Sequence, residues 1–249
     1  LQISVNWLKS QSEEGYDASY KKIISEASDA VPIYEQLIKM DRQNPEAYLY
    51  LGSTYGMRAR TAMASKEWLR VLYFGYQGLK YIRLAESIDS ELMDVYMPIG
   101  LMEYFSCLSS APVKLAAKIS GISTDCSLGL EHLNIAASSS HYSWIEASNV
   151  LSYAYLHIER DYNRCEVVIE PLVDQFPGHP FFAMMKGELL AKMGKWDQLD
   201  KLMPTLEQFT LSSSFLQKNE CPAGERGKPC EGWGWWSPPA ASRGPSGLF

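Results

Sequence analysis

Apolar positions recur every three or four residues along most of the chain, and this spacing predicts amphipathic helices. The pattern is clearest in residues 44–55, where an Asn-Pro turn precedes an apolar face made of Tyr48, Leu51, Gly52 and Tyr55. These positions share one side of a helix, because residues three and four apart lie one turn above each other. Gly52 stands among large neighbours, where a second helix can approach closely. The segment therefore predicts packing of helices against helices, and it contains no catalytic pattern.

The same periodicity predicts further helices, separated by turn residues. Pro32 divides the first of them into two or kinks it, and Thr124 or Asp125 caps the helix that begins at Cys126. Residues 106–124 form an insertion between two helices. The expected helices cover residues 17–41, 45–64, 66–88, a segment around 96–104, 126–138, 142–159, 162–176, 181–193 and 196–209.

The motif of residues 48–55 recurs along the chain. A small residue again stands among large apolar ones at Gly100, at Ser152 between Leu151 and Tyr155, and at Gly187. The spacing of these small residues is uneven, and only the last interval, 35 residues, is close to the period of a short helical repeat. The chain is therefore predicted to repeat one helix-hairpin unit, with extra residues in the first two units.

These units resemble the tetratricopeptide repeat, a helix–turn–helix of about 34 residues with small residues where helices cross. The resemblance implies a repeat-packing role for the residues that match the family pattern. Those residues are Tyr48, Leu51, Gly52, Tyr55, Gly100, Leu151, Tyr155, Tyr162, Cys165, Pro177, Gly187, Gly194 and Trp196. Residues 100–180 also resemble a branch that contains mitochondrial outer-membrane tetratricopeptide proteins linked to inclusion-body clearance, and bacterial relatives. That likeness is carried by Gly100, Tyr104, Pro112, Gly121, Asp125, Gly129 and Phe176-Pro177.

The predicted fold is all-α: about four to five antiparallel helix hairpins stacked into a right-handed, tetratricopeptide-like solenoid. The repeat domain is expected over residues 17–211, after a polar lead-in at residues 1–16. Residues 212–249 are rich in Gly, Pro and Trp, a composition that does not build a regular helical core, so this tail is predicted to be disordered.

Charge and hydropathy narrow the choice of partners. The net charge of −6 gives no general attraction to nucleic acid or to an anionic membrane surface. No apolar run approaches the roughly 20 residues that cross a bilayer. The chain starts at Leu1 without a signal sequence. We expect the cell envelope or periplasm if an N-terminal signal has been removed, and the cytoplasm otherwise.

The residues that could act in catalysis or bind a metal are scattered along the chain. Cys107, Cys126 and Cys165 fall in apolar helical segments and are predicted to act as small hydrophobes, whereas Cys221 and Cys230 are spaced to close a small disulfide loop in the tail. The four histidines never stand four residues apart on a helix, so no two-histidine metal site is predicted. The sequence contains no strand–helix turn that would present a nucleophilic Ser or Cys, and no glycine-rich loop that would bind a phosphate group. The sequence thus predicts neither an enzyme nor a cofactor site.

The predicted function is binding of a protein or peptide on the concave surface of the solenoid, through side chains of the first helix of each hairpin. Tyr50, Tyr73 and Tyr76 are the candidate contact residues, because exposed tyrosines give large contact area at low entropic cost. The insertion at 106–124 is amphipathic, and peripheral membrane contact through it is a second expectation. The alternative function is a small-ligand or lipid-handling protein with a pocket that the insertion closes. Partner identity and oligomeric state are not predicted.

Overall fold

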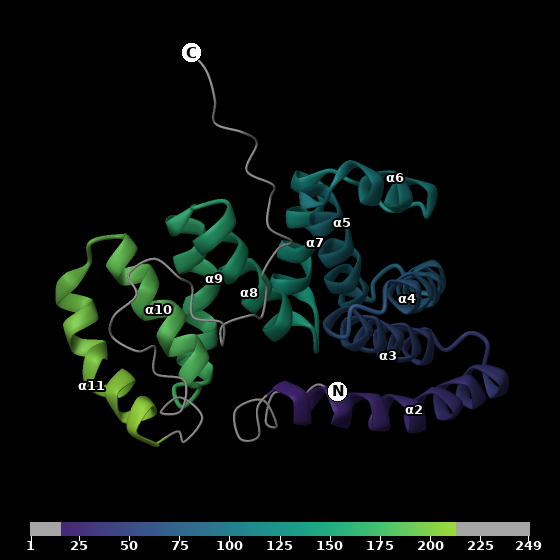
Figure 1. Cartoon of the computed structure of the whole chain (residues 1–249), viewed down its shortest axis with the longest axis horizontal. Coiled ribbons are helices and arrows are strands. Elements are labelled where there is room, and N and C mark those ends of the chain that lie inside the picture. Colours follow the sequence, from purple (N-terminus) through teal and green to yellow (C-terminus); the bar gives the residue numbers. More distant parts are fainter. Residues whose placement is uncertain (1–15, 213–249) are drawn as a thin grey trace, which may run out of the picture.

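The computed structural model describes residues 16–212, and this part of the chain is all-α, as predicted. It contains ten α-helices and no strand within those residues (Figure 1). The helices are α2 (Tyr16–Met40), α3 (Pro45–Ala64), α4 (Trp68–Ile88), α5 (Tyr96–Leu108), α6 (Ala111–Ile119), α7 (Cys126–Ser139), α8 (Trp144–Tyr153), α9 (Tyr162–Gln175), α10 (Pro180–Lys192) and α11 (Trp196–Ser212). A 3₁₀ turn, η1 (Met93–Val95), precedes α5, and a π-helical turn, η2 (Ala154–Ile158), extends α8.

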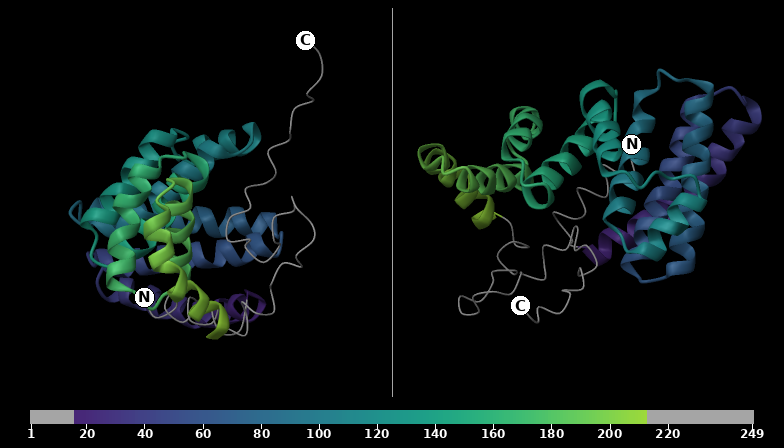
Figure 2. Two further views of the ribbon diagram at one scale, coloured as in Figure 1. Left: turned by 90° about the vertical axis from the view of Figure 1, so that its left-hand side faces the viewer. Right: turned by 90° about the horizontal axis from the view of Figure 1, so that it is seen from above.

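The helices pack mainly on their neighbours in the chain. α3 packs on α4, α5 on α7, α8 on α9 and α10 on α11, while α2 covers α3. Each pair also touches the next: α4 meets α5, α7 meets α8, and α9 meets α10. Seen from above, α8 to α11 extend away from the end of the molecule formed by α2 to α4 (Figure 2). The predicted lead-in up to residue 15 and the tail from residue 213, including Cys221 and Cys230, lie outside the described residues.

Side-chain caps begin several of these helices. The Asn44 side chain accepts a hydrogen bond from the Ala47 backbone N–H at 2.9 Å, and Pro45 occupies the first helical position. Asp125, one of the two caps predicted for α7, accepts from the Ser127 N–H at 2.9 Å. By contrast, α2 runs without a break through Pro32, so the predicted division into two helices is wrong.

A left-handed residue closes three helix ends in the same way. Lys66 follows α3 with a φ of 58°, Gly121 follows α6 with a φ of 74°, and Gly194 follows α10 with a φ of 68°. In each case the next backbone N–H bonds back to a carbonyl five residues earlier, at 2.9 Å. This arrangement is the Schellman motif, which satisfies the last carbonyls of a helix and turns the chain. One turn device thus reverses the chain between α3 and α4 and again between α10 and α11.

Two helix pairs meet through backbone contact at glycine. A Cβ added at Gly52 of α3 would lie 2.8 Å from the Ile82 side chain and 2.9 Å from the Gly78 carbonyl of α4. A Cβ added at Gly100 of α5 would lie 2.8 Å from the Gly129 carbonyl of α7. At each crossing the atoms in the way include a backbone carbonyl oxygen, which cannot move aside as a flexible side chain can. These crossings therefore require glycine for steric reasons.

The largest core cluster lies under the middle of the row of helices. It joins α5, α7, α8, α9 and α10. Its most buried members are Tyr104, Leu133, Leu151, Ala154, Tyr155, Leu156, Cys165, Ile169 and Leu189.

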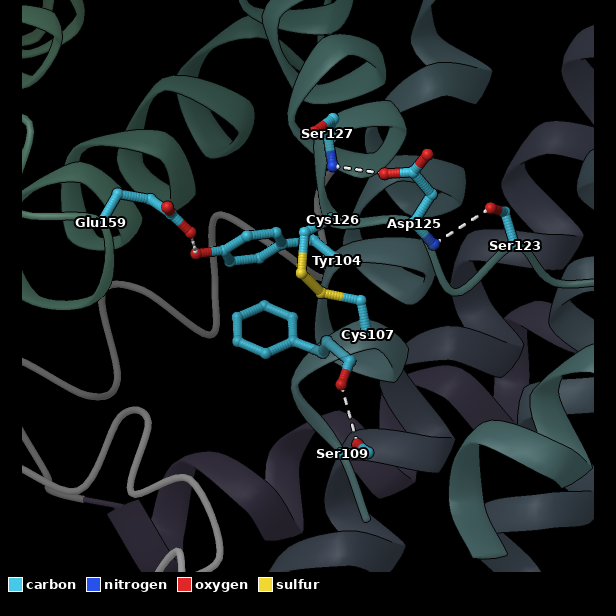
Figure 3. Close-up of a disulfide and its surroundings, with 9 residues drawn as sticks. Tyr104, Cys107, Ser109, Ser123, Asp125, Cys126, Ser127 and Glu159 are labelled. Atoms are coloured by element: carbon cyan, nitrogen blue, oxygen red, sulfur yellow. Dashed lines mark hydrogen bonds between the residues drawn. A yellow bond between two sulfur atoms is a disulfide. The ribbon is translucent and has the colours of Figure 1, made fainter. Parts of the chain in front are cut away.

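The structure corrects the prediction for two cysteines. Cys107, at the end of α5, and Cys126, at the start of α7, form a disulfide with their Cα atoms 5.4 Å apart (Figure 3). The prediction failed because the two cysteines are 19 residues apart in sequence, and only the packing of α5 on α7 brings them together. Cys165 is a free, buried thiol whose pKa is raised to about 12 by burial.

We predict that Gly52→Ala lowers the free energy of unfolding by about 1–3 kcal/mol, because overpacking a tight crossing forces α3 and α4 apart. The matched control is Gly56→Ala on the same helix, where an added Cβ meets nothing within 4 Å. That substitution should stabilise the protein by about 0.5–1 kcal/mol through helix propensity. Urea denaturation followed by circular dichroism measures both. Equal effects of the two substitutions would contradict the close crossing.

We also predict that removing the disulfide with C107S and C126S lowers the free energy of unfolding by about 3 kcal/mol, the loop-closure value for a loop of this length. Denaturation in the presence and absence of a thiol reductant measures the effect. The reductant should destabilise the native chain and leave the double variant unchanged. A native chain indifferent to the reductant would show that the bond does not form.

Candidate interaction surface on α4 and α6

One face of α4 exposes large apolar side chains. Leu69, Leu72, Tyr73 and Tyr76 have exposed fractions of 84%, 63%, 55% and 58%. Their spacing of three, one and three residues places them on one side of the helix. We call these four residues the α4 stripe. Contiguous apolar exposure of this kind marks an interaction surface more often than exposed apolar residues that stand singly.

The opposite face of α4 fixes the orientation of the stripe. Ile82 and Ala85 are buried, and the Tyr81 ring stacks on the Tyr55 ring of α3 at 5.8 Å between centroids. Burial raises the pKa of both tyrosines. Because this face is packed along its length, α4 cannot rotate to hide the stripe.

Basic residues surround the α4 stripe. Lys80 and Arg83 follow Tyr76 by four and seven residues, so they continue the same helix face, and both are exposed. The Arg58 guanidinium lies 4.2 Å from the centroid of the Phe74 ring. Arg70 forms an ion pair with Glu67 at 2.9 Å. Beyond Tyr76 the stripe face of α4 therefore continues into exposed basic residues, whereas the charge of Arg70 is balanced by Glu67.

α6, which lies within the predicted insertion, packs beside α4 (Figure 1). Ala117 of α6 and Ile122 after it are buried against Leu79 of α4. The Arg83 guanidinium donates a hydrogen bond to the Gly121 carbonyl at 2.7 Å. Since Leu79 lies three residues after Tyr76, α6 covers the helix face just beyond the stripe and leaves the stripe itself open.

The outward side of α6 is apolar. Pro112, Leu115, Ala116 and Ile119 are all exposed, with exposed fractions of 62% for Leu115 and 80% for Ile119. We call these four residues the α6 outer face. Lys118 lies exposed at its edge, and Lys114 is half-buried.

The three candidate contact tyrosines lie in two places. Tyr73 and Tyr76 belong to the α4 stripe, whereas Tyr50 of α3 is half-buried with its ring centroid 5.8 Å from that of Tyr34 in α2. The pKa of Tyr50 is raised by burial and by Glu46. The sequence analysis missed Leu69 and Leu72. Leu69 and Leu72 could have been found from the sequence, because their spacing from Tyr73 and Tyr76 places all four residues on one side of a helix.

Most of the residues predicted to pack the repeats lie at helix contacts. Leu51 and Tyr55 are buried, Tyr48 is half-buried beside Tyr81, and a Cβ added at Gly187 would lie 3.0 Å from Leu206 of α11. Leu151 and Tyr155 belong to the main core cluster, and Tyr162 packs against it. Pro177 is exposed in the turn between α9 and α10. Trp196 is exposed at the start of α11, the last helix of the described range.

Buried polar contacts join the helix pairs. Asp94 of η1 is buried and accepts hydrogen bonds from the backbone N–H groups of His141, Tyr142 and Ser143 at 2.7–3.0 Å. The Tyr104 hydroxyl donates to Glu159 at 2.6 Å (Figure 3), and burial raises the pKa of this tyrosine.

Two further contacts cross between helices. His132 Nδ1 lies 2.6 Å from a Glu103 carboxylate oxygen, and the Asn134 amide donates to the Tyr155 hydroxyl at 2.8 Å. These contacts, like those of Asp94 and Tyr104, give buried polar side chains hydrogen-bond partners within the fold. We therefore assign them a structural role.

The described residues offer no metal centre and no deep pocket at the insertion. Within residues 16–212, no group of three or more His, Cys, Asp or Glu side chains could hold a metal ion. The two best-formed hollows in this range lie along Lys186, Leu190 and Leu202, and around residues 194–198. Neither is lined by α4 or α6. Of the helices described, none is long and apolar enough to span a membrane.

No protein-family model, no curated protein and no solved structure matches the chain. The function of the chain therefore has to be inferred from the geometry of the α4 stripe and the α6 outer face.

We predict that Asp94→Asn lowers the free energy of unfolding by about 2 kcal/mol, because three backbone donors lose a charged acceptor in a buried site. Asp161→Asn is the matched control, since Asp161 caps α9 through the Arg164 N–H, a role that asparagine fills equally well, and its ion pair with the Arg164 side chain at 3.5 Å is at the surface. Thermal and urea unfolding measure both. The prediction fails if the two variants are equally stable.

Proposed function

We propose that the chain is a non-catalytic helical-repeat scaffold that binds a protein or peptide. Its helix pairs follow one another in chain order, and each pair contacts the next, which is the packing logic of a solenoid. The resemblance to the tetratricopeptide repeat and the glycine contacts at Gly52 and Gly100 support a right-handed solenoid of that kind. A scaffold of this class acts by shape and surface recognition, with no bond made or broken.

The observation that carries this proposal is the α4 stripe. Its exposed residues recur at helical spacing, the arrangement by which one helix packs on another. Tyr73 and Tyr76 are of the residue type that most often dominates interface energy. The proposal places recognition on α4, the second helix of the α3–α4 pair, which carries two of the three candidate tyrosines, and not on the first helices of the hairpins.

The chemistry around the stripe defines the partner. Arg70, Lys80 and Arg83 are exposed along α4, so an acidic partner gains both electrostatic steering and specificity. An amphipathic helix with apolar residues at helical spacing and acidic residues at its edges is the best fit. The alternative of a pocket closed by the insertion has less support, because the hollows described above lie near α10 and α11 and neither is lined by α6.

A selection from a displayed library of random helical peptides, with the full chain as bait, tests this function. We expect the enriched peptides to carry apolar residues at helical spacing together with Asp and Glu. Leu72→Ser combined with Tyr76→Ser should weaken their binding by about 30-fold or more, the loss typical of truncating one interface hot spot. Isothermal titration calorimetry with a synthesised peptide measures the affinity.

Val167→Ser is the control, because Val167 is exposed on α9, away from the stripe. It should leave peptide affinity unchanged. Peptides that bind the native chain and the α4 variant equally would refute the stripe as the binding surface. Failure to enrich any apolar and acidic helix would refute the proposed partner class.

A further inference from the structure

The insertion has a charge pattern unlike that of the rest of the chain. From Tyr104 to Thr124 the sequence contains no Asp or Glu, although the whole chain has a net charge of −6. The two charged residues in this segment are Lys114 and Lys118. A local basic segment in an acidic protein keeps an attraction for anions that the protein as a whole lacks.

The α6 outer face combines with these lysines in a specific geometry. Ala117 faces the protein and is buried, whereas Leu115 and Ile119 are the most exposed large apolar side chains of α6. Lys118 lies exposed next to the outer face. An apolar outer face bordered by lysine is the pattern of a helix that lies in the interface of a membrane.

The fold holds α6 firmly in this position. The Cys107–Cys126 disulfide closes the base of the segment (Figure 3), and the Arg83 hydrogen bond to the Gly121 carbonyl fixes its far end. A face this apolar would be covered if its role were packing within the fold. The structure instead braces α6 at both ends and leaves its apolar side in solvent.

We propose that the α6 outer face docks on the surface of a membrane that contains anionic phospholipid. A nine-residue helix with a few exposed apolar side chains offers on the order of 300 Å² of contact, well below the roughly 800 Å² per partner of a stable protein interface. A lipid surface needs only the insertion of these side chains, and the lysines complement its negative charge. The lipid surface therefore fits better than a second protein.

Docking through one short helix is weak and reversible. A single apolar anchor gives marginal membrane affinity, comparable to that of one acyl chain, and basic residues add to it. Binding should therefore depend on the fraction of anionic lipid and decrease as salt screens the lysines.

Vesicle flotation with the full chain tests this proposal, at about 1 mM accessible lipid. We expect binding to phosphatidylcholine vesicles that contain about 30 mol% phosphatidylserine, and little binding to pure phosphatidylcholine. Leu115→Ser combined with Ile119→Ser should lower the partition coefficient by about tenfold or more, because the inserted apolar area is lost. Lys114→Gln combined with Lys118→Gln should lower binding to the anionic vesicles by a similar factor.

Both pairs of substitutions change mainly exposed side chains, and unchanged circular dichroism and melting temperature verify that the variants fold. Val167→Ser should keep full vesicle binding. The L72S and Y76S variant should also keep it, which separates this proposal from peptide binding at the α4 stripe. The proposal is overturned if the native chain ignores anionic vesicles, or if the α6 variants bind them as well as the native chain does. A change of oligomeric state in the L115S and I119S variant, with vesicle binding intact, would assign the face to a second copy instead.

Discussion

The structure depends on helices that approach closely enough for their backbones to touch. At the crossing of α3 and α4, Gly52 lies against Gly78, and at the crossing of α5 and α7, Gly100 lies against Gly129. The glycines bring the two backbones of each pair into direct contact at these points. Because α4 is packed against α3 along its inner side, its remaining apolar residues have to face outward. The close crossing thus produces the exposed stripe.

Buried polar side chains of the described residues form hydrogen bonds that join these helix pairs to one another. Asp94 ties η1 to the start of α8, Tyr104 ties α5 to the residue after η2, and His132 meets Glu103 between α7 and α5. Buried polar groups contribute to a fold only when their partners satisfy them. Since these groups already have partners within the fold, they serve structure.

The insertion adds a second surface without disturbing the first. α6 rests on α4 through Ala117, and the Cys107–Cys126 bond confines the segment to the junction of α5 and α7. A disulfide stabilises such a segment mainly by restricting its unfolded state, so the helix needs little buried area of its own. Two apolar surfaces with different surroundings, one rich in tyrosine and one bordered by lysine, then lie at the same end of the molecule (Figure 1).

The sequence by itself determined the all-α class and the approximate helix bounds, because helical periodicity and caps such as Asn44 and Asp125 are local. Tertiary structure decided which cysteines pair, that α2 passes through Pro32, and that Leu69 and Leu72 join Tyr73 and Tyr76 in the open. The exposure of an apolar face depends on which helices cover it. That covering is a long-range contact between segments, and no pattern within one helix encodes it.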